Sequence, residues 1–205
     1  MLFRSRAVLS MVGRIISFLS LAQLAPIIIA LIYGESIAPF VVALVVGLVG
    51  GQAIEFACGR RSALVTVREA FAVVSLTWAV AALWGGTPYL VAGGELGNVV
   101  DSYFETMSGF TTTGSTVIVD FASHDHAIYF WRGLTQWLGG MGIVALAIAV
   151  LGRTGPGGKA LLEREAPGPD SDKLTPRIRD TALHLWLVYV GLSLAMVLIL
   201  LAIWT

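Results

Sequence analysis

The chain has 205 residues, of which 57% are hydrophobic and 13% are charged, and its formal net charge is zero. Soluble domains carry roughly twice that share of charged residues, so the composition indicates a protein whose solvent is lipid. The sequence has no basic stripe with interleaved aromatic residues, which argues against nucleic-acid binding. Its single cysteine, Cys58, excludes a disulfide bond within the chain.

Five stretches are apolar and long enough to cross about 30 Å of hydrocarbon, which takes about 20 helical residues. Pro26 lies in the first stretch and is expected to kink its helix. Gly47 and Gly51 lie one turn apart in the second and are expected to allow close helix packing. We predict membrane-spanning helices over 15–33, 40–58, 70–92, 133–151 and 181–204.

Of the 13 basic residues, all except Arg132 fall on one side of this arrangement. The positive-inside rule makes that side cytoplasmic, and the N-terminus lies there too. The outer segments contain acids that either concentrate cations in a vestibule or are ordinary solvated loop residues. These acids are Glu35, Glu95, Asp101, Glu105, Asp120 and Asp125.

The segment 93–132 would begin and end on the outer side, yet it contains a helix-like stretch over 101–110. At about 1.5 Å per residue, this stretch covers only about half of the hydrocarbon thickness. Asp101 and Ser102 are its expected N-cap residues. We therefore predict a re-entrant half-helix, because non-helical backbone at membrane depth occurs only where it is buried or lines a cavity.

A cluster of threonine, glycine and serine over 111–116 follows the half-helix. Backbone carbonyls, helped by hydroxyls, can replace the water shell of a dehydrated potassium ion. Gly114 can adopt positive φ, which lets successive carbonyls point the same way. The half-helix also directs the negative end of its dipole toward this segment. Such a cluster is more often a surface loop, but its position here favours an ion filter.

Three further residues surround this segment in the sequence. Glu105 in the half-helix is expected to form an ion pair with Arg132, although Arg132 could instead lie in the membrane interface. Trp131 is expected in an interfacial aromatic belt. Gly139 is expected to permit close helix contact and to leave room for the half-helix.

Three motifs occur in order along the chain: FETMSGFTTTGST over 104–116, FWRGLTQWLGGMGI over 130–143, and EAPGP over 165–169 with DKLTPR over 172–177. They resemble the first pore loop, the helix after it and the segment that follows in Trk-type potassium uptake proteins of the Trk/Ktr/HKT superfamily. With the two leading helices, the resemblance covers essentially the whole chain.

The resemblance implies an all-α integral membrane fold with repeats of helix, pore loop and helix around a pseudo-fourfold axis. On that scheme, 1–68 is a two-helix membrane segment, 69–152 is one repeat, 153–180 is a cytoplasmic loop and 181–205 is the first helix of a second repeat. The family has four pore loops and this sequence has one. We therefore expect the chain to be the truncated N-terminal portion of a longer protein.

The resemblance also implies which residues contact the ion. Ion-facing oxygens would come from Thr112, Thr113, Gly114 and Ser115, with potassium at the first three, and the supporting residues would be Thr111, Thr116, Glu105 and Arg132. Replacing Gly114 by serine is expected to crowd the carbonyl-bearing backbone and to weaken potassium selectivity.

The implied function is potassium transport rather than enzymatic catalysis, with no cofactor in this chain. The implied partners are three further pore repeats, a second copy of the transport subunit in a homodimer, and a cytoplasmic nucleotide-binding regulatory subunit of the TrkA type. The implied location is the inner, or plasma, membrane of the cell.

Two alternatives remain open on the residues alone. Four copies of the chain could assemble into a small cation channel, each giving one filter segment. A membrane-embedded metal-dependent enzyme could use Asp120, His124 and His126, but His-x-His spacing without four nameable ligands is a weak signal.

Overall fold

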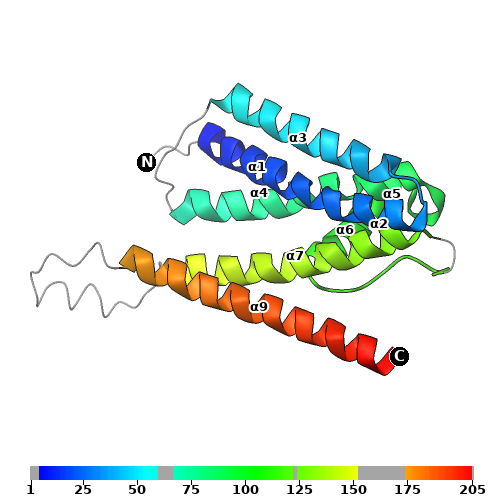
Figure 1. Ribbon diagram of the computed structural model, residues 1–205. Helices are drawn as coiled ribbons and strands as arrows, with labels where there is room; N and C mark the ends of the chain where they lie inside the picture. The colour runs from blue at the N-terminus through cyan, green and yellow to red at the C-terminus, as the bar shows by residue number, and fades with distance from the viewer. Residues whose placement is uncertain (1–4, 60–66, 122–123, 152–173, 205) are drawn as a thin grey trace, which may run out of the picture. The chain divides into compact units, whose positions relative to one another are not determined.

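The computed structural model describes residues 5–59, 67–121, 124–151 and 174–204, and all regular secondary structure in these ranges is helical. The chain divides into two compact units, Met1–Gly139 and Gly140–Thr205. In chain order the elements are α1 Ser5–Ser20, η1 Leu21–Gln23, α2 Leu24–Tyr33, α3 Ala38–Cys58, α4 Val67–Gly85, α5 Thr87–Ala92, η2 Gly94–Leu96, α6 Val99–Phe110, α7 His126–Leu151 and α9 Leu174–Trp204 (Figure 1).

Four helical segments in the described part of the chain are long and apolar enough to cross a membrane. Four of the five predicted spans fall within or overlap them. The fifth predicted span, 133–151, lies within the helix α7. Its last nine residues, 143–151, are all apolar in the sequence. The four segments are Ser5–Tyr33, Ala38–Cys58, Arg68–Ala92 and Leu183–Ile203.

The first span is interrupted by one turn of 3₁₀ helix, η1, just before Pro26. Proline lacks an N–H group, and its ring clashes with the carbonyl four residues earlier, here that of Ala22. A 3₁₀ turn therefore lies on the N-terminal side of the proline, and the kink itself stays a prediction.

Glycines bring the first three long helices close together. A Cβ atom on Gly51 of α3 would lie 2.5 Å from the carbonyl oxygen of Gly13 of α1, and one on Gly47 would overlap the ring of Trp84 of α4. The Trp84 Nε1 donates a 2.7 Å hydrogen bond to the Ala43 carbonyl of α3. The predicted packing role of Gly47 and Gly51 is confirmed.

The core of the first unit contains Trp131, which is completely buried. Its Nε1 donates to the Gly85 carbonyl at 2.9 Å, and its ring meets that of Trp84 edge to face. The expectation of an interfacial position for Trp131 is wrong, because a polar indole nitrogen can be buried when a backbone carbonyl accepts from it.

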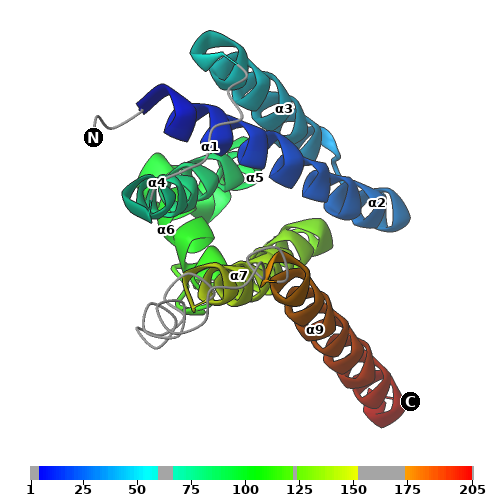
Figure 2. The same cartoon turned by 90° about the vertical axis from the view of Figure 1, so that its left-hand side faces the viewer.

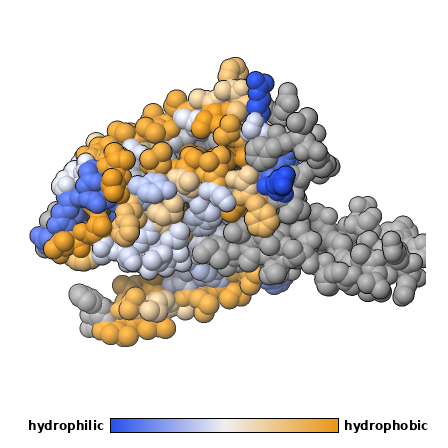
Figure 3. Space-filling model, turned by 180° about the vertical axis from the view of Figure 1, so that it is seen from behind, coloured by the Kyte–Doolittle hydropathy of each residue, from blue (hydrophilic) through white to orange (hydrophobic). Residues whose placement is uncertain are grey.

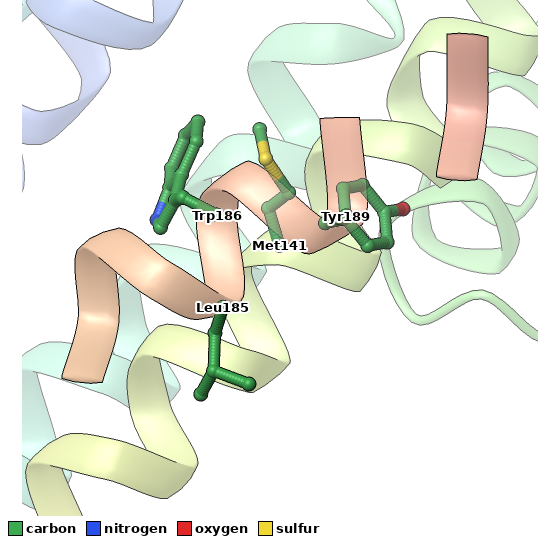
Figure 4. A pocket seen from close by; sticks show the side chains of 4 residues that line it. All are labelled: Met141, Leu185, Trp186 and Tyr189. Atoms are coloured by element: carbon green, nitrogen blue, oxygen red, sulfur yellow. The ribbon is translucent and has the colours of Figure 1, made fainter. Parts of the chain in front are cut away.

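In the second unit, α7 packs against α9. Leu185, Trp186 and Tyr189 of α9 surround Met141 of α7 and leave a space of about 10 Å³ (Figure 4). That volume is about the minimum for one water molecule. α9 begins at Leu174, inside the predicted cytoplasmic loop 153–180, of which residues up to 173 lie outside the described part of the chain.

The surface of the helices is rich in apolar side chains, and large apolar areas are visible in Figure 3. None of the most apolar stretch of α9 is buried. Monomeric soluble proteins rarely expose apolar areas of this kind, so the surface agrees with a lipid environment.

The glycine contacts generate a prediction with a control on the same helix. Gly51→Ala should destabilise the protein by about 1–3 kcal/mol, because the new methyl group meets backbone atoms of α1. Gly50→Ala meets nothing within 4 Å and should be neutral or stabilising by up to about 1 kcal/mol. Thermal unfolding of both variants in detergent measures the difference, and equal melting temperatures would contradict the packing.

Candidate functional site

The half-helix expected over 101–110 is α6, which begins at Val99. Its N-cap is Asn98, whose side-chain oxygen accepts from the Asp101 N–H at 2.9 Å. The expectation that Asp101 and Ser102 cap the helix is therefore wrong. The Ser102 hydroxyl instead donates to the Leu96 carbonyl at 2.6 Å, which ties the first turn to the preceding segment.

Glycines on neighbouring helices make room for α6, which lies beside α4 in Figure 2. A Cβ atom on Gly85 would lie 2.7 Å from the Thr106 side chain. Gly139 of α7 lies directly against the carbonyl of Phe110, and Gly109 of α6 lies against the Thr135 side chain. The expected space for the half-helix at Gly139 is thus confirmed.

An irregular segment over residues 111–121 follows α6, and its first peptide groups cap the helix. The N–H groups of Thr113 and Gly114 both donate to the carbonyl of Ser108, at 3.0 and 3.4 Å. In a trans peptide group the C=O points opposite to the N–H. The carbonyls of Thr112 and Thr113 therefore both point away from α6, on the same side of the backbone.

This alignment requires an unusual backbone. Thr112 has φ 57° and Gly114 has φ 79°. Gly114 adopts positive φ without penalty, as predicted. For a β-branched residue such as threonine, the same region is an outlier that costs about 1–3 kcal/mol and tends to mark ligand-binding segments. The sequence gives no signal for the strain at Thr112.

The four backbone oxygens predicted to face an ion differ in their partners. Across the described residues, the carbonyls of Thr112 and Thr113 accept no hydrogen bond. The Gly114 carbonyl accepts from Arg132 Nη2 at 3.2 Å, and the Ser115 carbonyl accepts from the Ser108 hydroxyl at 2.5 Å. A carbonyl has two lone pairs, so one donor leaves a second acceptor site on each of these oxygens.

The threonine hydroxyls brace the segment. Thr111 Oγ1 donates to the Met107 carbonyl at 2.8 Å and lies 2.8 Å from Thr113 Oγ1. Thr112 Oγ1 donates to the Thr111 carbonyl at 2.7 Å. Each hydroxyl that donates in this way keeps lone pairs that can accept or coordinate.

Glu105 lies at the centre of the hydrogen-bond network of the site and is completely buried. One carboxylate oxygen pairs with Arg132 Nε, as predicted. The other accepts from the Thr116 hydroxyl at 3.0 Å and from the Val117 N–H at 3.1 Å. A buried charge is tolerated only when it is paired and hydrogen-bonded, and this carboxylate satisfies both conditions.

The crowding expected at Gly114 is not found. A Cβ atom there would meet no described atom within 4 Å. The cost of a side chain at this position comes instead from its positive φ.

Two further outer carboxylates accept hydrogen bonds from backbone N–H groups. The sequence pattern does not predict these contacts. Glu95 accepts from the Val119 N–H at 3.0 Å, just beyond the irregular segment's contacts with Glu105. Glu35, between α2 and α3, accepts from the N–H groups of His126 and Ala127 at 2.8 and 2.9 Å and so caps α7. At least three of the six predicted outer acids, Glu35, Glu95 and Glu105, therefore bind backbone N–H groups.

The two histidines considered for a metal site belong to separate networks. His126 Nδ1 lies 2.7 Å from Glu35, and its ring stacks on Tyr33 at 4.2 Å. His124 Nε2 lies 3.9 Å from Glu95. Among the residues that the structure describes, no group of three or more histidine, cysteine or acidic side chains is placed to hold a metal ion.

Glu35 lies outside the membrane-spanning segments, and its ionisation is coupled to the α7 cap. Burial raises the pKa of its carboxyl group, but hydrogen bonds from Ala127 and His126 outweigh this and hold the pKa below its ordinary value of 4.5. The folded state therefore favours the ionised carboxylate.

Known proteins are similar to this chain over nearly its whole length. The family model of TrkH, described as a cation transport protein, matches residues 36–205. The Trk system potassium uptake protein TrkH of Vibrio parahaemolyticus is 40% identical over 192 residues, which are 93% of this chain and 40% of that protein. TrkG of Escherichia coli K12 is 34% identical over 93% of this chain and 40% of its own length.

A solved structure is also similar. The crystal structure of the potassium transporter TrkH from Vibrio parahaemolyticus matches with a TM-score of 0.77 and 36% identity, over 94% of this chain and 38% of that chain. The chain thus spans 40% of the length of the curated relatives named above.

The Glu35 cap predicts a pH-dependent stability. Because its pKa is lowered on folding, the carboxylate stabilises the protein above about pH 4.5, and this contribution is lost as the pH falls through the folded-state pKa. Glu35→Gln should cost about 0.5–2 kcal/mol at pH 7 and much less at pH 3.5. Thermal unfolding at both pH values measures this. Asp125→Asn, which removes a nearby exposed charge but no side-chain hydrogen bond to a described residue, should have the smaller effect; an equal effect would contradict the cap.

Proposed function

The chain belongs to the TrkH family of cation transport proteins, and from this premise we propose that residues 111–116 form one quarter of a potassium selectivity filter. The family is one of transport proteins, not enzymes, and the chain is a multi-pass membrane protein. Potassium is the proposed transported ion because the relatives are named as potassium uptake proteins.

One observation carries the proposal: the carbonyls of Thr112 and Thr113 point the same way and lack protein donors in the described part of the chain. Stacked rings of carbonyls are how potassium filters replace the hydration shell of the ion. A potassium ion is proposed to contact Thr112, Thr113 and Gly114, with Ser115 as a fourth oxygen source. On the side away from the ion, the proposed supporting residues are Thr111, Thr116, Glu105 and Arg132.

The half-helix adds an electrostatic contribution. The C-terminal end of α6 carries partial negative charge, and it ends at Phe110, where the filter segment begins. A cation held by the following carbonyls would lie close to this end. The effect is modest for an exposed helix end and larger in a dehydrated site, where the dielectric constant is lower.

One filter segment supplies too few oxygens to enclose a dehydrated ion, so the proposed pore needs three further segments around one axis. They are proposed to come from further repeats of the same polypeptide. We also propose a homodimer of the transport subunit, a cytoplasmic nucleotide-binding regulatory subunit as partner, and an inner-membrane location with the N-terminus in the cytoplasm.

The filter assignment predicts a loss of selectivity in Gly114→Ser. Serine at φ 79° strains the backbone by about 1–3 kcal/mol and should tilt the neighbouring carbonyls. The ratio of potassium to sodium uptake should fall in cells that lack other potassium uptake systems and express the full-length protein. Gly34→Ser is a matched control, because Gly34 also has positive φ, 68°, and open space around it but lies outside the filter. Unchanged selectivity in Gly114→Ser, or an equal loss in Gly34→Ser, would refute the assignment.

The support assignment predicts strong effects at the buried ion pair. Arg132→Gln should cost about 3–5 kcal/mol of stability, because it leaves the fully buried Glu105 carboxylate without its cation. Glu105→Gln should cost less, because the Arg132 side chain is 18% exposed, and both variants should reduce potassium uptake. Arg14→Gln breaks another arginine–glutamate pair, in which the Arg14 side chain is 56% exposed, and should cost about 1 kcal/mol or less. Melting temperature and uptake are measured together, and normal expression and uptake in both buried-pair variants would rule out the supporting role.

A further inference from the structure

An open groove lies between the first turns of α1 and residues 72–79 of α4. Both helices begin at the same end of the first unit (Figure 1). Its volume is about 440 Å³, within the range of roughly 300–1,000 Å³ that is typical of sites for small molecules. Ser5, Val8 and Leu9 of α1 line one side, and Ala72, Leu76 and Ala79 of α4 line the other.

The lining is almost entirely apolar, so the groove suits a hydrocarbon chain better than water or an ion. Val8, Leu9 and Leu76 present branched side chains, while alanines at 72 and 79 create the hollow. Both helices belong to candidate membrane spans, Ser5–Tyr33 and Arg68–Ala92. In a bilayer the groove would open to lipid near one surface of the membrane.

Helical spacing puts two arginines beside this groove, next to its lining residues. Arg68 precedes Ala72 by four residues and Ser75 and Leu76 by seven and eight, so helical spacing places it on the groove face of α4. Arg6 directly follows Ser5 on α1. Both arginines are exposed, and long basic side chains near helix ends extend toward the interface, where lipid phosphates lie.

Among the described residues, Arg6 and Arg68 form no ion pair. Arg14, the next arginine along α1, is paired with Glu55 of α3 at 2.7 Å. Glu69, next to Arg68, is 4% exposed and has its own interaction. Of the described charged residues beside the groove, Arg6 and Arg68 are exposed, while Glu69 is buried in the protein.

We propose that this groove binds an anionic phospholipid, with one acyl chain along α1 and α4 and the phosphate held by Arg6 and Arg68. An apolar slot with basic residues at the membrane surface is complementary to such a lipid in both shape and charge. The proposal depends on the membrane location of the chain and not on the filter assignment.

The test uses the intact protein purified in detergent and titrated with phosphatidylglycerol or phosphatidylcholine carrying identical acyl chains. Native mass spectrometry counts the bound lipid. Phosphatidylglycerol should bind more tightly, and Arg6→Gln and Arg68→Gln should each weaken it about fivefold. The double variant should bind the two lipids equally, because only the charge contribution has been removed.

A second set of variants tests the groove itself. Ala72→Trp should reduce binding of both lipids several-fold by filling the hollow, and Ala79→Leu narrows the same groove should the tryptophan variant fail to fold. Val49→Trp, on the exposed surface of α3, which contributes no residue to the groove, is the matched control and should bind lipid as the unmodified protein does. Equal affinity for the two lipids in the unmodified protein, or unchanged binding in the groove-filling variants, overturns the proposal and leaves another protein segment as the occupant.

Discussion

The fold around the candidate filter depends on one buried carboxylate. Glu105 is completely enclosed, and its two oxygens bind Arg132 of α7 and the hydroxyl and N–H groups of Thr116 and Val117. These contacts tie together a half-helix, an irregular segment and a long helix. Because an isolated charge in the interior is very costly, the three parts hold one another in place.

The same physical constraint recurs along the outer segments. Backbone N–H groups in irregular segments and at helix starts need acceptors. Carboxylates fill that role here: Glu95 binds Val119, and Glu35 binds the first residues of α7. Acids that their position in the outer segments would assign to an electrostatic vestibule thus contribute to the structure. The carbonyls of Thr112 and Thr113 point away from α6 and accept no hydrogen bond from the described residues.

Local patterns in the sequence were sufficient to predict the helices, the half-helix and the positive φ of Gly114, because length, hydropathy and residue type determine these features. The Glu105–Arg132 pair was also predictable, since two opposite charges near membrane depth need partners. The Glu35 cap joins residues 91 positions apart, and no local pattern carries such a contact. Burial of Trp131 and strain at Thr112 likewise arise from packing around α6, which is settled only in three dimensions.

The central claim is that the outward-turned carbonyls of Thr112 and Thr113 take the place of water around a potassium ion. The most direct measurement is anomalous diffraction from crystals of the full-length transporter soaked in thallium(I), which mimics potassium and scatters strongly. The account predicts thallium density in direct contact with both carbonyl oxygens. An ordered segment over residues 111–116 with those oxygens facing protein donors, and thallium bound elsewhere or not at all, would contradict it.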